Sequence, residues 1–267
     1  MSSLRDGAPI SPDVRSFFRA IKENPDDDTP RLIFADWLQE RGDAASAARG
    51  EYLRLSVMRH RLPPDDPDYE LIKRREAEIF TEHRWQWLGP LTDAARGWTF
   101  ERGMVQITAS ADKLLTSEVA DWARTEPSWW IDALKLTDLT PSHIKRLVRF
   151  PLLSHLNTLD LSDNQNFRNG IRRLLDALCA AQMHCLARFL LCRVGFSRIP
   201  YTAWGFAGFV RLNVLDLRHN RLDDTVARML TSYTYFPEGA TILLGHNRIT
   251  EVGRELLRRA FGDRVQF

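Results

Sequence analysis

Leucine-type side chains recur at fixed spacings through the second half of the chain. The two clearest copies of the pattern are LNTLDLSDN, at 156–164, and LNVLDLRHN, at 212–220. Apolar residues occupy the first, fourth and sixth positions of each copy, and Asn occupies the ninth. The apolar residues that alternate in the middle predict a short strand with one buried face. The Asn predicts a turn in which its side-chain amide bonds the neighbouring backbone.

Three weaker copies extend this pattern in both directions. They begin at Ile131, Leu186 and Gly239, so that successive copies start 25 to 30 residues apart. Helix-like spacing of apolar residues follows the strands, for example between Ile171 and Leu178. One such unit alone would leave its apolar face in water, and we therefore expect the units to stack on their neighbours.

Some copies depart from the pattern at the turn. Leu139 and Val194 stand where the other copies have Asn, and they predict less regular turns. The longest copy has additional residues near 166–169, which predict a loop at one rim. The segment 251–267 predicts a terminal helix with a closing tail that caps the open end of the stack.

The L-x-x-L-x-L-x-x-N arrangement resembles that of leucine-rich repeats. The resemblance implies an α/β fold, a short solenoid with a parallel sheet on its concave side and helices on its convex side. A compact sandwich or bundle that merely contains such strings is the alternative, and five copies in phase argue against it.

The first third of the chain has a different pattern, which predicts four helices. Ser11-Pro12 and Thr29-Pro30 provide the Ser/Thr-Pro start that is typical of helices. A third helix is expected at 44–61 and a fourth after the turn-forming LPPDDPD at 62–68. We expect Tyr52, Leu55 and Met58 of the third helix to face inward, and the apolar residues of the fourth helix to share one face; these are Leu71, Ile72, Ile79 and Phe80.

A second resemblance covers this region. The stretches NPDDDTPRLIFADWLQERGD at 24–43 and ARGEYLRL at 48–55 resemble the repeat-companion domain, a helical module that precedes leucine-rich repeats in some bacterial proteins. WQWLGPL at 85–91 and FERGMVQIT at 100–108 resemble the connecting region of such chains. The resemblance implies a helical cap at 1–95 followed by repeats at 96–267, and it supplies no catalytic residues.

At the junction we expect a helical block to cover the first strand, because an uncovered edge strand invites aggregation. The strand near 103–108 is expected to begin the sheet, with Trp98 and Phe100 beside it. The segment 111–124 is then expected to form the first crossover helix.

Composition narrows the function classes. A net charge of +2 provides no large field, and we do not expect binding of nucleic acid in bulk. We expect no membrane span and no secretory signal, because there is no apolar run of the required length and the first residues are polar. Three cysteines in a chain of this length favour the reducing cytoplasm.

Three groups of residues could carry chemistry of their own. The acidic run at 26–28 is expected to interact with a helix N-terminus rather than with a metal ion. A Cys/His cluster leaves a metal-dependent enzyme or regulator open as an alternative, although its spacing matches no common zinc site; its members are Cys179, His184, Cys185 and Cys192. A rim of His219, Arg221, His246 and Arg248, with the two histidines about 5 Å apart, leaves anion or RNA binding as a weaker alternative.

The main hypothesis is a non-enzymatic module that binds a partner protein along the concave face of the sheet, possessing neither cofactor nor metal. No phosphate-binding loop, metalloprotease helix or nucleophile elbow occurs in the sequence. Outward positions of the strands combine charges with accessible leucines, as protein-binding surfaces do. The residues expected to contact the partner are Lys135, Asp160, Ser162, Arg188, Leu190, Asp216, Arg218 and Leu243.

Overall fold

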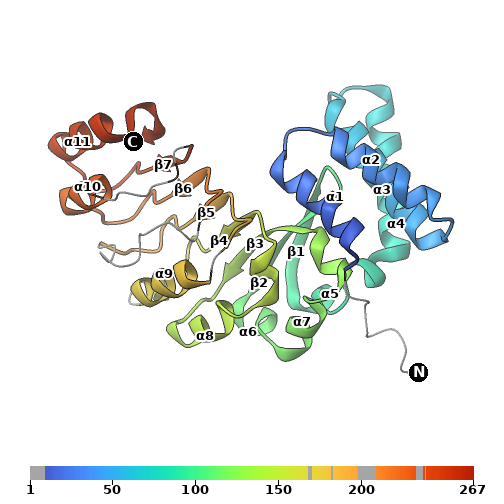
Figure 1. The fold of residues 1–267 in the computed structure, drawn as a ribbon, viewed down its shortest axis with the longest axis horizontal. Coiled ribbons are helices and arrows are strands. Elements are labelled where there is room, and N and C mark those ends of the chain that lie inside the picture. Colours follow the sequence, from blue (N-terminus) through green and yellow to red (C-terminus); the bar gives the residue numbers. More distant parts are fainter. Residues whose placement is uncertain (1–9, 168–169, 182, 198–208, 233–236, 238) are drawn as a thin grey trace. The chain divides into compact units, whose positions relative to one another are not determined.

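A computed structural model describes residues 10–167, 170–181, 183–197, 209–232, 237 and 239–267. Over these residues the fold is α/β, with eight strands that form one mostly parallel sheet in chain order (Figure 1). Contacts divide the chain into two compact units, which we name the helical unit (up to residue 107, with 117–132) and the strand unit (108–116, with 133–267). The division of the chain into folding domains at 95/96 stays a prediction.

The first and third helices of the helical unit begin where the sequence predicts. The Ser11 hydroxyl accepts a hydrogen bond from the Val14 backbone N–H at 3.3 Å, and Asp43 accepts one from the Ser46 N–H at 2.8 Å, so both starts are capped by side chains. The elements of this unit are α1 (Pro12–Glu23), α2 (Thr29–Glu40), α3 (Ala44–Arg61), α4 (Pro67–Leu88), α5 (Leu91–Ala94), β1 (Ala95–Glu101), the first part of β2 (Met104–Ser110), α7 (Ser117–Trp122) and the 3-10 helix η1 (Glu126–Trp130).

Aromatic rings form much of the core of the helical unit. Phe34 stacks on Trp130 with ring centroids 5.2 Å apart, and Phe18 meets the edge of Trp130 at 4.9 Å. A second cluster packs Tyr52 against Trp87 at 5.1 Å. Such pairs add to the stabilisation that comes from the burial of the rings.

One residue that was expected inside the helical unit lies at its surface. Met58 is 46% exposed, whereas Tyr52, Leu53 and Val57 of the same helix are buried. The prediction was wrong here because apolar spacing alone does not fix which of two neighbouring stripes of a helix meets the core.

The sheet begins earlier than the sequence analysis predicted. β1 precedes β2, and the two-residue turn between them contains Arg102 and Gly103 at φ of +46° and +80°. Two residues with positive φ are typical of tight hairpin turns, and glycine reaches this region without strain. The expected crossover helix at 111–124 is also replaced by two short helices, α6 (Ala111–Leu114) and α7.

The strand unit alternates short strands with helical segments. In Figure 1, α9 and α10 lie to one side of the row of strands. Besides the end of β2 and α6, its described elements are β3 (Ile131–Thr137) from residue 133 on, η2 (Pro141–His143), α8 (Ile144–Leu147), η3 (Pro151–Ser154), β4 (Thr158–Asp160), η4 (Gln165–Phe167), α9 (Ile171–Ala180), β5 (Arg188–Leu190), β6 (Val214–Asp216), α10 (Asp224–Thr231), β7 (Thr241–Leu243), α11 (Glu251–Phe261), η6 (Gly262–Arg264) and β8 (Val265–Gln266).

Equivalent positions of the five sequence copies lie side by side in this sheet. β3 to β7 pair in parallel, each with the next, and the register aligns the fourth position of every copy. These aligned side chains are at most 1% exposed; they are Leu134, Leu159, Phe189, Leu215 and Ile242. Each such burial contributes about 1.5–3 kcal/mol, so every strand depends on its neighbours for much of its stability.

The turn after each strand repeats as well. The residue just before the Asn position has a positive φ, between +55° and +68°, in all five copies; these residues are Asp138, Asp163, Arg193, His219 and His246. The prediction of less regular turns at Leu139 and Val194 was therefore wrong. Their backbone N–H groups are bonded by the Asn of the following copy, Asn164 and Asn220, at 2.8 and 3.1 Å.

The C-terminal segment forms the predicted helix, α11, and then continues the sheet. Residues of β8 pair in parallel with β7, with Val265 beside Ile242. The closing tail is thus an additional strand, which the sequence pattern did not indicate. Within the described part of the chain, none of the helices combines the length and apolar character that a membrane crossing needs.

Candidate functional site

The outward side chains of β3 to β7 form a continuous row across the sheet of the strand unit. We name this row the strand face. The register places in one line Lys135, Asp160, Leu190, Asp216 and Leu243. All five were predicted from the alternation along the strands, and all but Asp216 are partly accessible.

Three predicted residues of the strand face remain available to a partner. Arg188 is exposed and makes no ion pair with any described residue. Leu190 and Leu243 are half-buried, so part of each side chain reaches the surface. An unpaired guanidinium beside accessible leucines can bind a carboxylate while apolar area is removed from water.

Three other predicted residues are engaged within the strand unit. The Asp216 carboxylate is 4% exposed and accepts hydrogen bonds from the Arg218 backbone N–H at 3.0 Å and from its Nη2 at 2.7 Å. Ser162 is also buried, and its hydroxyl accepts a hydrogen bond from the Cys192 backbone N–H at 3.0 Å. These groups stabilise the turns that end β4 and β6, and their hydrogen-bonding capacity is largely used internally.

At the other end of the row, four charges form a chain of ion pairs. Lys135 lies 3.7 Å from Asp160 and 3.2 Å from Asp163, and Arg193 donates to Asp163 at 2.6 Å. The hydrogen bond from Arg193, followed by the bond from Lys135, lowers the pKa of the Asp163 carboxyl. The sequence analysis missed Asp163 and Arg193, although they precede the Asn position by one residue, as His219 does.

His219 and His246 lie together at the rim, as their equal offsets predicted. Their rings stack with centroids 4.1 Å apart and an interplanar angle of 10°. Partial desolvation, then repulsion from His246 and Arg193, lowers the pKa of His219. The lowered pKa favours the uncharged form of the His219 ring.

The described residues of the Cys/His cluster do not form a metal site. Cys185 is half-buried and Cys192 is buried, both as free thiols, whereas His184 is exposed. Burial, followed by the charge of Asp216, raises the pKa of the Cys192 thiol, which opposes formation of a reactive thiolate. The side chain of Cys179 lies outside the described residues. In the part of the chain that the structure describes, no three His, Cys, Asp or Glu side chains could hold a metal ion together.

The acidic run before α2 is bound to arginines and to the helix start. Asp27 accepts a hydrogen bond from the Thr29 backbone N–H at 2.8 Å, which, together with the Thr29 side chain, lowers the pKa of Asp27. Asp28 pairs with Arg61 at 2.8 Å and with Arg102 at 3.3 Å. The interaction with the helix N-terminus is therefore made by Asp27, whereas Asp28 forms ion pairs with two arginine side chains.

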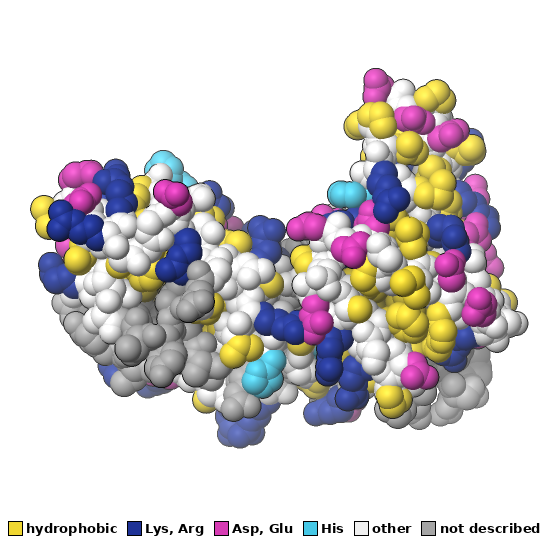
Figure 2. Space-filling view, turned by 45° about the horizontal axis from the view of Figure 1, so that its top comes forward, with side chains coloured by type: hydrophobic (Ala, Val, Ile, Leu, Met, Phe, Trp, Pro, Cys, Tyr) yellow, Lys and Arg dark blue, Asp and Glu magenta, His cyan; other side chains and the backbone are white. Residues whose placement is uncertain are grey.

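The surface of the strand unit carries both positive and negative side chains. Figure 2 shows basic, acidic and hydrophobic side chains mixed on the visible face of the strand unit. Such a surface suits contacts with a protein, in which apolar anchors are surrounded by paired charges.

No protein-family model matches the chain, and no curated protein sequence matches it either.

Proposed function

We propose that this chain is a non-enzymatic, bacterial, cytoplasmic leucine-rich-repeat protein that binds a partner protein on the strand face. In this proposal the strand unit is a short solenoid, and the helical unit is a repeat-companion cap. The carrying observation is the in-register row of outward residues, from Lys135 to Leu243, that five parallel strands present together.

The turn geometry supports the repeat assignment. Asn164, Asn220 and Asn247 each donate from the side-chain amide to the backbone of their own copy and of the preceding copy. Equivalent bonds at three of the five copies are what a stacked repeat requires, since each turn needs its neighbour to satisfy its backbone groups.

The strand face supports a binding role through Arg188, Leu190 and Leu243. Arg188 is a cation without an ion-pair partner among the described residues, and it lies two positions before Leu190 on β5, on the same face of the strand. Arg and apolar anchors of this kind contribute a large share of the binding energy at protein interfaces. Asp160, Ser162, Asp216 and Arg218 then serve mainly to hold the face in place.

Quantitative affinity purification from the native cell tests the proposal. The charge reversal Arg188→Glu should reduce recovery of a specific partner at least about tenfold, because one charged contact is worth roughly 1.5–3 kcal/mol. Arg172→Glu is the matched control, since Arg172 is an exposed arginine on α9. Equal recovery with both variants would move the binding site away from the strand face.

A further inference from the structure

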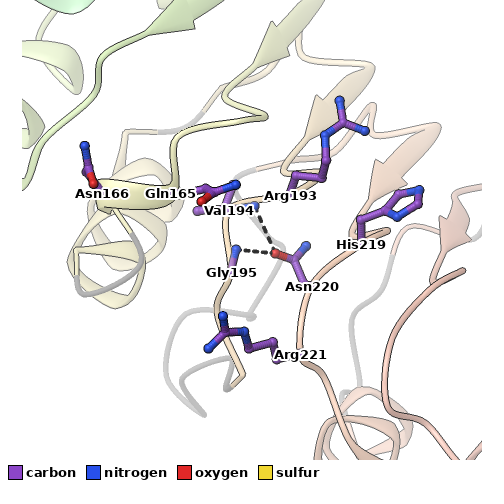
Figure 3. Close-up of a pocket in the computed structure, with 8 residues that line it drawn as sticks. All are labelled: Gln165, Asn166, Arg193, Val194, Gly195, His219, Asn220 and Arg221. Carbon is purple, nitrogen blue, oxygen red and sulfur yellow. Dashed lines mark hydrogen bonds between the residues drawn. The ribbon is translucent and has the colours of Figure 1, made fainter.

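A pocket of about 540 Å³ opens at the rim of the strand unit, beside the turns that follow β4, β5 and β6. Figure 3 shows Arg193 and His219 on one side of the Asn220 amide and Arg221 on the other. The volume lies within the range of ligand sites in proteins. The remaining lining residues are Gln165, Asn166, Val194 and Gly195.

The pocket exists because one copy of the repeated turn lacks a side chain. Gln165, Gly195, Arg221 and Arg248 each follow the Asn position of their copy by one residue. At Gly195 a Cβ would meet no atom of a described residue within 4 Å, so the column of side chains has a gap at this copy. Gly195 has a φ of +85°, which explains why the turn takes glycine.

The charges around the gap are unequally neutralised. Arg193 is paired with Asp163 at 2.6 Å, whereas the side chain of Arg221 makes no ion pair with a described residue. Asp223 lies two residues after Arg221, but its carboxylate accepts a hydrogen bond from the Thr225 backbone N–H at 2.9 Å at the start of α10. Arg221 therefore presents to the pocket a guanidinium that makes no ion pair with the part of the chain that the structure describes.

Neutral donors complete the lining. The side-chain amides of Gln165 and Asn166 are exposed and have no hydrogen-bond partner among the described residues. The Asn220 amide, in contrast, is fully used: its oxygen accepts from Val194 and Gly195 at 3.1 and 2.8 Å. Amide N–H groups beside a free guanidinium offer a carboxylate several donors at once.

We propose that this pocket binds a carboxylate side chain from an acidic segment of the partner protein. The inference rests on the proposed function, because it identifies the chemistry that the partner brings to the edge of the strand face. Arg221 forms the ion pair, and Gln165 and Asn166 donate the accompanying hydrogen bonds. The gap at Gly195 admits the chain that carries the carboxylate.

The test uses a fluorescein-labelled hexaglutamate peptide and the whole protein, with fluorescence anisotropy at low salt as the measurement. Arg221→Gln should weaken binding about tenfold, as expected for the loss of one charge-assisted contact. Arg172→Gln, which removes the same charge from α9, should change it less than about twofold. Gly195→Asn keeps the net charge, suits the positive φ and fills the gap, and it should also weaken binding.

Equal effects of Arg221→Gln and Arg172→Gln would overturn the inference, because only diffuse attraction would then remain. The absence of any binding by the wild-type protein would overturn it as well. Circular dichroism of each variant identifies those that fail to fold. Where one fails, Gln165→Ala takes its place in the binding measurement, because the Gln165 side chain is exposed and its removal does not disturb the core. If Arg188→Glu still releases the partner while Arg221→Gln has no effect, the pocket inference fails and the proposed function stands.

Discussion

Replacement of Asn220 by Ala tests whether the repeated turns hold the strand unit together. The Asn220 side chain accepts from the backbone N–H groups of Val194 and Gly195, and it donates to the Leu191 and Leu217 carbonyls at 2.8 and 2.9 Å. The residue is 7% exposed, so water replaces these bonds poorly.

The magnitude follows from the backbone groups that lose a partner. The Leu217 carbonyl keeps a bond from Asn247 at 3.0 Å, which leaves the two N–H groups and the Leu191 carbonyl without this partner. At about 1 kcal/mol or more for each group, Asn220→Ala should lower the free energy of unfolding by about 3 kcal/mol. For a unit of this size the melting temperature should fall by roughly 6–12 °C.

Asn213→Ala is the matched control for this measurement. Asn213 is exposed and its side chain has no partner among the described residues, so its replacement should change stability by less than about 0.5 kcal/mol. Urea unfolding followed by circular dichroism compares the two variants. Equal losses for Asn220→Ala and Asn213→Ala would refute the assignment of these bonds to turn stability.

Two further predictions concern single side chains. Arg49 is buried between Trp87 and Trp130, with its guanidinium carbon 4.1 and 3.8 Å from the ring centroids, and burial lowers the pKa of Arg49 to about 9. The aliphatic part of the Arg49 side chain packs against its neighbours, whereas its charge is desolvated. Arg49→Met should therefore have a free energy of unfolding within about 1 kcal/mol of the wild type, and Arg49→Ala one that is lower by about 2–4 kcal/mol, in urea titrations. Equal losses for the two variants would contradict this. For His219, the folded state holds the pKa below its ordinary value of 6.5, so its contribution to stability is present above that pH and is lost as the pH falls. The melting temperature of the wild type should therefore fall more between pH 7.5 and 5.5 than that of His219→Asn, and parallel curves would exclude a role for the histidine pair.

The sequence predicted the strand register well because a strand of period two buries every second side chain. Leu159 and Leu215 are both fully buried, and the intervening copy aligns Phe189 with them. The role of Asn at the ninth position was also predictable, because a side-chain amide that directly follows a strand has mainly the backbone of the turn to bond with. Local pattern and long-range packing agree at these positions.

Other features depend on contacts that no local pattern encodes. The burial of Asp216 against Arg218 cannot be read from alternation, which places both residues on the outer side of the strand. β8 is a two-residue strand, too short for a periodic signal. The pocket depends on the absence of a side chain at Gly195, and it becomes visible only when neighbouring copies are placed beside one another.

Site-specific photo-crosslinking in the native cell tests the central claim most directly. A photoreactive amino acid would replace Arg188 or Leu243 on the strand face, and Arg172 on α9 or Arg228 on α10 as controls. The account predicts one partner protein crosslinked from positions 188 and 243 and absent from positions 172 and 228. Capture of the same partner from the helices, with none from the strand face, would contradict it.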